Sequence, residues 1–103
     1  MQPHKTVLCV DDDRSVLTAT KALLEYKGYE VITVDTGQRA VDHVCIPFDL
    51  VIVDYNLPDF NGDVVAERWK QERPAVPILM LSGSLDLPEH ALDHVNAHLI
   101  KGA

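Results

Sequence analysis

Short apolar runs alternate with segments of helical spacing along the whole chain, and this alternation restricts the fold more than any other feature of the sequence. Five runs are apolar on both faces, which is typical of strands buried inside a parallel sheet. They cover Thr6–Val10, Val31–Val34, Leu50–Val53, Val76–Leu81 and His98–Ile100. Strands that alternate with helices predict an α/β domain whose helices cover both faces of a parallel sheet.

Four helices are predicted between these strands from the spacing of apolar residues. Gly28 supplies a stop for the first helix, and Pro88 suits the first turn of the last one. The predicted helices cover Arg14–Lys27, Gln38–Cys45, Asp63–Glu72 and Pro88–Val95. Trp69 falls within the third helix, and we expect it to pack in the core.

Composition narrows the class of protein. The 103 residues are 47% hydrophobic, enough for one domain over residues 1–103. The net charge of −7 and the absence of a basic run argue against direct binding to nucleic acid. The sequence contains neither a signal-peptide pattern nor an apolar stretch of roughly 20 residues, so we expect a cytoplasmic protein without a membrane span. Cys9 and Cys45 lack metal or redox spacing and are expected to be reduced thiols.

Polar residues follow four of the five predicted strands, at the point where each strand ends. Three carboxylates come directly after the first strand, at positions 11–13, and Asp54 follows the third. Ser82 follows the fourth strand and Lys101 the fifth. Because parallel strands end along one edge of a sheet, and open α/β sheets bind ligands at that edge, these side chains are expected to form one site.

The chemistry of this set of side chains indicates a site for an anionic group. Crowded carboxylates repel one another unless a positive charge compensates them. Mg²⁺ binds through one or two carboxylates and keeps several waters, and Lys101 balances a further charge. With Ser82 as a hydrogen-bond donor and Asp54 as a nucleophilic oxygen, these are the components of phosphoryl transfer.

Four segments resemble the signature segments of one protein family. VLCVDDD, LVIVDYNLPDFNG, ILMLSGS and HLIKG occur in the order found in the receiver domains of two-component response regulators, the CheY-like family. The resemblance covers essentially the whole chain. It implies a flavodoxin-like, doubly wound parallel sheet of five strands in the order 2-1-3-4-5.

The resemblance also assigns roles to individual residues. Asp54 matches the aspartate that accepts the phosphoryl group, and Asp11 and Asp12 match the acidic pair that binds Mg²⁺ together with Asp54. Asn56 matches the residue whose backbone carbonyl completes the metal site. Lys101 matches the lysine that pairs with phosphoryl oxygens.

A second group of matched positions concerns the switch and the loop beside it. Ser82 matches the hydroxyl residue that contacts the phosphoryl group and moves inward. His98 stands where the family has the Tyr or Phe that follows this movement. Pro58 and Gly62 match residues that shape the loop after Asp54, and Asp13 is expected to cap the first helix.

The chain departs from the family pattern at its C-terminal end. Family members continue after the lysine with a proline and a fifth helix, whereas Gly102 and Ala103 follow Lys101 here. We therefore expect apolar residues of the first, third and fifth strands to lie exposed beside the first helix, where a partner or a second copy of the chain in a homodimer would cover them. Without such a cover, we expect the chain to be markedly less stable than one that carries a fifth helix. The stretch from Ser82 to Lys101 is also short, so we expect a reduced fourth helix.

The resemblance implies a sensor histidine kinase or a phosphotransfer protein as phosphodonor, and leaves the downstream effector unknown. One alternative is a degenerate receiver that acts only as an interaction module. Another is a phosphatase of the haloacid-dehalogenase type, with Asp11 as nucleophile and Asp13 as acid. His90 and His94, four residues apart on a predicted helix, are a weak candidate metal pair.

Overall fold

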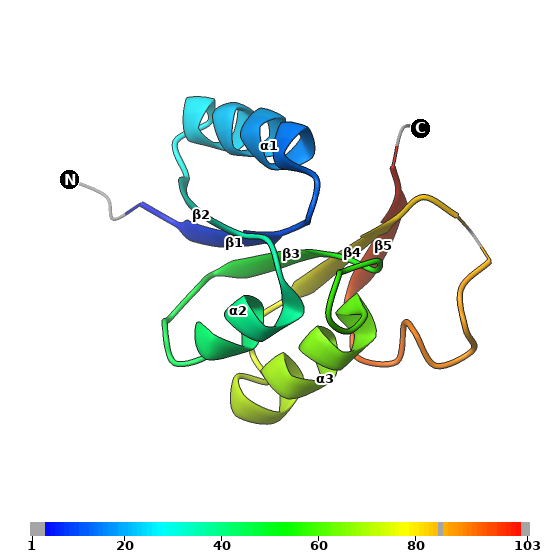
Figure 1. Cartoon of the computed structure of the whole chain (residues 1–103). Coiled ribbons are helices and arrows are strands. Elements are labelled where there is room, and N and C mark those ends of the chain that lie inside the picture. Colours follow the sequence, from blue (N-terminus) through cyan, green and yellow to red (C-terminus); the bar gives the residue numbers. More distant parts are fainter. Residues whose placement is uncertain (1–3, 85, 102–103) are drawn as a thin grey trace.

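The structure is a computed structural model, and it describes residues 4–84 and 86–101. Figure 1 shows a central sheet with helices on both sides. Five parallel strands lie in the order β2-β1-β3-β4-β5, as predicted. The elements are β1 (Thr6–Val10), α1 (Arg14–Tyr26), β2 (Glu30–Val34), α2 (Gly37–Asp42), β3 (Leu50–Asp54), α3 (Gly62–Glu72), β4 (Ile78–Ser82) and β5 (Ala97–Ile100).

The two faces of the sheet are covered unequally. Figure 1 shows α1 alone on one face, over β1 and β2, and α2 and α3 together on the other. Alternate residues of β1 serve the two faces: Val7 and Cys9 join the cluster under α1, while Leu8 and Val10 join the larger cluster under α2 and α3. Strands that are apolar on both faces therefore belong to a covered parallel sheet, as the sequence predicted.

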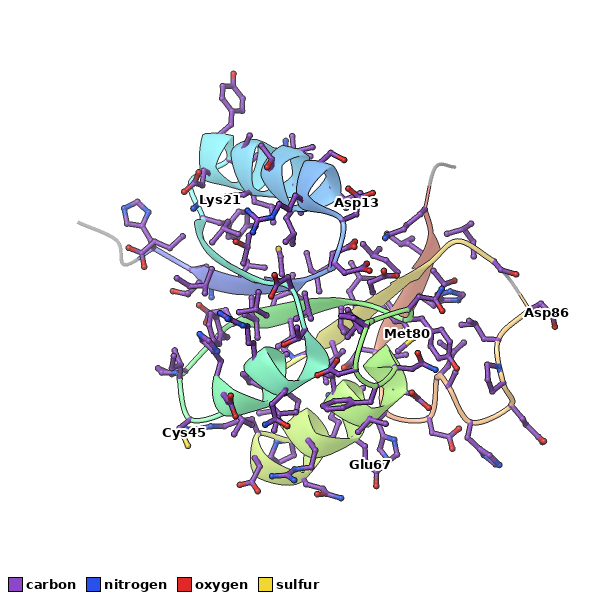
Figure 2. The ribbon with its side chains drawn as sticks, in the orientation of Figure 1. Asp13, Lys21, Cys45, Glu67, Met80 and Asp86 are labelled. Atoms are coloured by element: carbon purple, nitrogen blue, oxygen red, sulfur yellow. The ribbon has the colours of Figure 1, made fainter. Side chains whose placement is uncertain are left out.

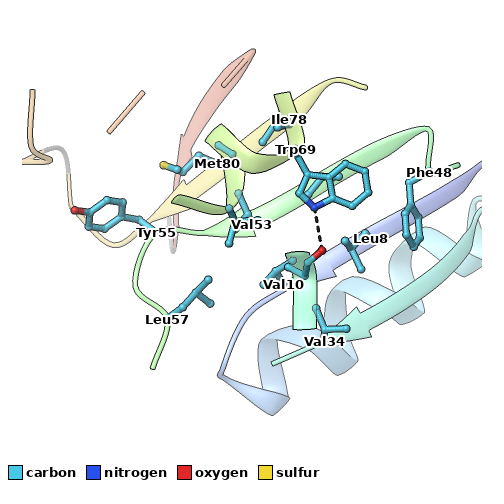
Figure 3. Close-up of a cluster of buried hydrophobic side chains, with 14 of the residues drawn as sticks. Leu8, Val10, Val34, Phe48, Val53, Tyr55, Leu57, Trp69, Ile78 and Met80 are labelled. Carbon is cyan, nitrogen blue, oxygen red and sulfur yellow. Dashed lines mark hydrogen bonds between the residues drawn. The ribbon is translucent and has the colours of Figure 1, made fainter. Parts of the chain in front are cut away.

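Trp69 of α3 is the largest fully buried side chain of the described residues. Its ring lies edge-on to Phe48, with ring centroids 5.9 Å apart, and its Nε1–H donates to the carbonyl oxygen of Ala40, 3.0 Å away (Figure 3). The hydrogen bond satisfies the polar atom of the ring, which allows the whole indole to be buried. The prediction that Trp69 packs in the core is confirmed.

The ends of the first two helices follow from individual residues. Asp13 precedes α1 and accepts hydrogen bonds from the N–H groups of Ser15 and Val16, which confirms the predicted cap. Thr36 caps α2 in the same way. After α1 the chain reverses at Gly28, whose φ of 97° is the left-handed conformation that favours glycine.

Two predicted boundaries were wrong by two residues or more, and the other boundaries of the observed elements lie within one residue of those predicted. The fourth strand begins at Ile78 and not at Val76, because Pro77 has no N–H to contribute to a sheet. The second helix ends at Asp42 and not at Cys45. After Asp42 the chain continues in turns, with the N–H of Val44 bonded to the carbonyl of Val41 and that of Ile46 to the carbonyl of His43.

The helix predicted over Pro88–Val95 is absent, and this prediction was wrong. The segment forms successive turns closed by hydrogen bonds between residues three apart, such as Ala91 N–H to the Pro88 carbonyl at 3.0 Å and Val95 N–H to the Leu92 carbonyl at 3.3 Å. Its apolar contribution to the core is small, with Ala91 buried and Val95 partly buried. Short helices depend on packing for their stability, and this segment offers too little apolar surface to supply it.

Within residues 4–84 and 86–101, one part of the sheet carries no helix. On the side of α1, apolar side chains of β3, β4 and β5 form what we call the open sheet face, which consists of Leu50, Ile52, Leu79, Leu81 and Leu99. Leu99 is 56% exposed. The predicted exposure of the fifth strand is confirmed by Leu99, but that of the third and first strands was wrong: in β3 only Leu50 is partly exposed, and Ile52 is buried. Val7 and Cys9 of β1 are buried, and the exposed strip includes β4 instead.

The remaining expectations from the sequence concern thiols and membranes. Cys9 is buried under α1, whereas Cys45 is exposed on the turn after α2 (Figure 2). Burial, followed by the nearby charge of Asp11, raises the pKa of the Cys9 thiol to about 11, so Cys9 is protonated and inert. No helix within the described residues has the length and apolar character needed to cross a membrane.

Candidate functional site

Three carboxylates meet at the C-terminal edge of the sheet, where β1 and β3 end side by side. Asp11 and Asp12 follow β1, and Asp54 is the last residue of β3. One carboxylate oxygen from each residue can be chosen so that all three lie within 4.8 Å of one another. Asp11 and Asp54 are buried, with 3% and 4% exposure, whereas Asp12 is exposed. The register of the parallel strands thus produces the acidic cluster that the sequence predicted.

Lys101 supplies the positive charge of the site. Its Nζ lies 2.7 Å from Oδ2 of Asp11 and 3.1 Å from Oδ2 of Asp54. The N–H of Lys101 also donates to the carbonyl oxygen of Ser82 at 2.7 Å, which continues the pairing of β5 with β4 and fixes where the lysine side chain starts. One ammonium therefore bridges two buried carboxylates that come from different strands.

The pKa values reflect burial together with this pairing. Burial raises the pKa of Asp54, the Lys101 ammonium opposes that rise, and the neighbouring charge of Asp11 adds to it, so the net direction is upward. For Lys101, burial alone would lower the pKa, but hydrogen bonds to Asp11 and Asp54 outweigh it and raise the pKa above its usual value. The ionised form of Asp54 is thus less stable here than in water, and a further cation nearby would stabilise it.

The site fits a hard divalent cation such as Mg²⁺. Three carboxylates share one ammonium, so negative charge remains uncompensated. Oδ2 of Asp11 is buried and has no hydrogen bond of good geometry within the described residues, although Lys101 Nζ lies 2.7 Å away as an ion-pair partner. Carboxylate oxygens are the ligands that Mg²⁺ prefers, and one or two of them suffice when the cation keeps several waters.

Two of the residues named from the sequence lie at the margin of this cluster. Asp13 is exposed, and its Oδ1 is occupied by the N–H of Ser15 at 3.0 Å and the hydroxyl of Ser15 at 2.6 Å. These bonds, that from the hydroxyl first, lower the pKa of Asp13, which acts as a helix cap. Asn56 is exposed two residues after Asp54, and its backbone N–H helps to lower the pKa of the Asp54 carboxyl. His90 and His94 are both exposed and lie outside the cluster.

The loop after Asp54 is held by close backbone contacts at Gly62. The N–H of Gly62 donates to the carbonyl of Tyr55 at 2.7 Å, and a Cβ at this position would overlap the carbonyl oxygen of Asp54. Only glycine allows this approach. The glycine thus lets α3 begin directly against the residue that carries the central carboxylate.

Asp59, in the same loop, was missed by the sequence reasoning. Its carboxylate accepts hydrogen bonds from the N–H groups of Gly37 and Gln38, each at 2.8 Å, at the first turn of α2. Burial alone would raise the pKa of Asp59, but the hydrogen bonds from backbone N–H groups together outweigh it and lower the pKa. An aspartate beside Pro58 suggests a turn, but nothing local shows that its partner lies 22 residues away.

Ser82 and His98 are in contact, as their predicted association in a switch requires. Oγ of Ser82 lies 2.7 Å from Nε2 of His98 and 2.6 Å from the carbonyl oxygen of Ser84. Ser82 is buried and His98 is partly buried. The hydroxyl therefore has two partners, one in the loop after β4 and one on β5.

Comparison with known proteins places these features in a family. Residues 7–100 match the family described as "Response regulator receiver domain". The chain is 36% identical over 80 residues to the alkaline phosphatase synthesis transcriptional regulatory protein PhoP of Bacillus subtilis, covering 77% of this chain and 33% of PhoP. It is 33% identical over 99 residues to the sensor histidine kinase GacS of Pseudomonas protegens, covering 92% of this chain and 10% of GacS. The chain thus spans about a third or less of these two relatives.

Solved structures agree with this assignment. A CheY-like receiver domain protein from Methanospirillum hungatei superposes with a TM-score of 0.91 and 31% identity, over 98% of this chain and 84% of that one. The response regulator protein TrrA from Thermotoga maritima, solved in complex with Mg²⁺-BeF, has a TM-score of 0.86 and 26% identity, over 94% of this chain and 86% of that one.

The raised pKa of Asp54 predicts how stability depends on pH. A carboxyl whose pKa is higher in the folded than in the unfolded chain binds more protons when folded, so the free energy of unfolding falls as the pH rises from the unfolded pKa through the folded one. Asp54→Asn removes the ionisable group, and with it this decrease in the free energy of unfolding at higher pH. Without divalent cations, we expect the variant to melt at a higher temperature than the parent at pH 7, and the difference to shrink below pH 4.

Asp86→Asn is the matched control, because Asp86 lies exposed on the loop between β4 and β5, away from the site (Figure 2). Its melting curve should follow that of the parent at both pH values. A lower melting temperature for Asp54→Asn at pH 7 would show that the pairing of Asp54 with Lys101 outweighs its burial.

Proposed function

The chain belongs to the response regulator receiver domain family of two-component signalling, and on that premise we propose that Asp54 accepts a phosphoryl group in a Mg²⁺-dependent reaction. The observation that carries the proposal is the pairing of one ammonium, Lys101, with both Asp11 and Asp54 beside a third carboxylate, Asp12. Burying charged groups costs free energy of folding, and buried clusters of ionisable groups with shifted pKa values occur most often at functional sites. Residues 1–103 are proposed to form one receiver domain.

In the proposed reaction, an oxygen of ionised Asp54 attacks the phosphorus of the donor. A bond forms between this oxygen and phosphorus, and the bond from phosphorus to the donor nitrogen or oxygen breaks, with the electron pair leaving on the donor. Lys101 exchanges its contact with the Asp54 carboxylate for one with the phosphoryl oxygens, which offsets the negative charge that they bring. The hydroxyl of Ser82 donates a hydrogen bond to another phosphoryl oxygen.

Asp11, Asp12 and Asp54 would hold Mg²⁺, together with the backbone carbonyl of Asn56. When bound there, Mg²⁺ supplies electrostatic stabilisation of the transferring group. The TrrA structure contains Mg²⁺-BeF, which supports the assignment by analogy. The uncompensated charge of the three carboxylates in this chain supports it independently.

The proposed phosphodonor is a sensor histidine kinase or a phosphotransfer protein. The match to GacS, a sensor histidine kinase, is consistent with such a pathway. In this role the chain catalyses only its own phosphorylation and dephosphorylation and does not act as an enzyme on other substrates. The net charge of −7 disfavours direct contact of this chain with nucleic acid, so its output passes through another domain or protein.

Two alternatives predict different phosphorylation behaviour. A degenerate receiver would bind partners without accepting a phosphoryl group. A phosphatase of the haloacid-dehalogenase type would be labelled on Asp11, with Asp13 as its acid. Oδ1 of Asp13 is engaged in capping α1, and Asp13 is not one of the three clustered carboxylates, which disfavours the latter.

We expect a small phosphodonor such as acetyl phosphate, with Mg²⁺, to place one phosphoryl group on Asp54, located by mass spectrometry of peptides. Asp54→Asn should abolish labelling, because an amide is not a nucleophile, and Lys101→Met should slow it about 100-fold, the typical cost of one electrostatic contact to a transferring group. Asp13→Asn, which keeps the helix cap, is the control and should be labelled normally. A label on Asp11, or full labelling of Asp54→Asn, would refute the assignment.

Mg²⁺ should bind weakly to the parent chain, since the site offers few protein ligands and leaves the cation several waters. Calorimetric titration of Asp12→Ala should show an affinity lower by at least about 10-fold. Asp86→Ala, at an exposed carboxylate outside the site, serves as control and should bind like the parent. Equal affinities in Asp12→Ala and the parent would place the cation elsewhere.

We also propose that this chain forms a homodimer through the open sheet face. Leu99 is the most exposed member of that face and lies beside Leu81 in the sheet register. Contiguous exposed apolar surface on a soluble chain usually marks an interface. Covering a few hundred Å² at roughly 25 cal/mol per Å² yields several kcal/mol before the costs of association.

Sedimentation at micromolar concentration should therefore show a dimer for the parent and a monomer for Leu99→Lys, whose ammonium would be desolvated in the interface. Leu92→Lys is the control, because Leu92 is 40% exposed on the turns before β5 and outside the open sheet face. A parent chain that is monomeric at all concentrations tested would rule out this interface.

A further inference from the structure

A pocket of about 400 Å³ lies where α1, the end of β2 and the first turn of α2 meet. This volume is within the range typical of sites for small molecules. The lining residues do not include the carboxylate cluster, Ser82 or Lys101, so the function proposed above leaves the pocket unexplained. We call it the α1–β2 pocket, and its polar lining residues are Arg14, Thr18, Lys21, Thr33, Asp35 and Arg39.

The lining of the α1–β2 pocket is basic, although the chain is acidic overall. The net charge of the chain is −7, yet three of its nine Lys and Arg residues line this one pocket. Arg39 is partly neutralised by Asp35, with 3.6 Å between Nε and Oδ1. Within residues 4–84 and 86–101, Arg14 and Lys21 form no ion pair. Two cations of the pocket thus lack a counter-ion in the described chain, and a concave surface lined by positive charge concentrates anions.

The spacing of these two cations indicates the size of the anion. Arg14 and Lys21 are seven residues apart on α1, which is two helical turns. They therefore lie on the same side of the helix, about 10 Å apart along its axis. A ligand that fills the pocket over this length is larger than a free phosphate ion.

The other lining groups favour an organic molecule that carries a phosphoryl group. The guanidinium of Arg14 has parallel N–H donors that match phosphate oxygens, and Thr18 and Thr33 carry hydroxyl donors. Leu17 and Val34 also line the pocket and are buried, so they offer apolar surface to a carbon skeleton. Charge, donors and apolar surface are thus present in one pocket.

We propose that the α1–β2 pocket binds a small organic phosphate, with Arg14 and Lys21 as its two charged contacts. The inference goes beyond the proposed function and does not depend on it, because the pocket shares no residue with the proposed phosphoacceptor site. Arg14 and Thr18 are exposed, so a ligand enters from solvent without a change in the fold.

Calorimetric titration in EDTA tests the proposal, since binding through Mg²⁺ at the carboxylate cluster is then excluded. The probes are ADP, GDP, phosphoenolpyruvate and inorganic phosphate. We expect at least one of the organic phosphates to bind with a Kd below about 1 mM, and inorganic phosphate to bind at least about 10-fold more weakly than that ligand. If no organic phosphate binds, or if inorganic phosphate binds equally well, the proposal is overturned.

Substitutions test whether the two cations hold the ligand. Arg14→Gln and Lys21→Gln should each weaken binding about 10-fold, the usual effect of losing one charged hydrogen bond. Arg68→Gln is the matched control, because Arg68 is exposed on α3, on the opposite face of the sheet, and its substitution removes the same charge (Figure 1). Its affinity should stay within about 2-fold of the parent, since salt screens distant charges. Equal weakening in Arg68→Gln and Arg14→Gln would reveal attraction to net charge alone and contradict the proposal.

NMR of backbone amides in the parent chain locates the ligand without any substitution. Addition of the same organic phosphate should shift the amide signals of Thr18, Thr33 and Asp35 and leave those of Asp54 and Lys101 unchanged. Shifts confined to Asp54 and Lys101 would refute the α1–β2 pocket as the site. Neither measurement needs Mg²⁺ or a phosphodonor, so a failure of phosphorylation at Asp54 would leave this result intact, and a failure to bind here would leave the proposed phosphorylation intact.

Discussion

The pairing of Lys101 with Asp11 and Asp54 is the interaction on which the rest of the site depends. Both carboxylates are almost fully buried, and neither would remain ionised there without a nearby cation. The three residues belong to the ends of β1, β3 and β5, so the ion pairs form only when the strands are in parallel register. Burial and the charge of Asp11 raise the pKa of Asp54 despite the ammonium, so the negative charge of the cluster is only partly compensated.

The surrounding fold serves to hold this edge in place. Gly62 permits α3 to start against the carbonyl of Asp54, and Asp59 ties the same loop to the first turn of α2. On the opposite side of the site, Lys101 and Ser82 are joined through the backbone of β5 and β4. The carboxylates, the ammonium and the hydroxyl thus sit on strand ends or on loops fixed by hydrogen bonds, which keeps the arrangement precise.

Much of the fold could be predicted because its signals are local. The apolar runs of the five strands, Gly28 after α1 and Asp13 before it each act through neighbours in the sequence, and the structure confirms them. The predicted helix over Pro88–Val95 failed for a different reason. Its spacing was compatible with a helix, but the segment buries little beyond Ala91, and packing, which the sequence does not display, decides whether so short a helix forms.

For the candidate site too, some features could be predicted from the sequence and others were determined only by the tertiary structure. The residue types of the cluster and their positions at strand ends are properties of the sequence, because the order of strands and the rule that parallel strands end along one edge bring Asp11, Asp12, Asp54, Ser82 and Lys101 together. The tertiary structure alone decided which partners their atoms have: Lys101 bridges two carboxylates, Asp59 reaches α2, and Ser82 turns toward Ser84 and His98. Hydrogen bonds between residues distant in the sequence depend on distances of a few tenths of an ångström, and only the packed chain determines those distances.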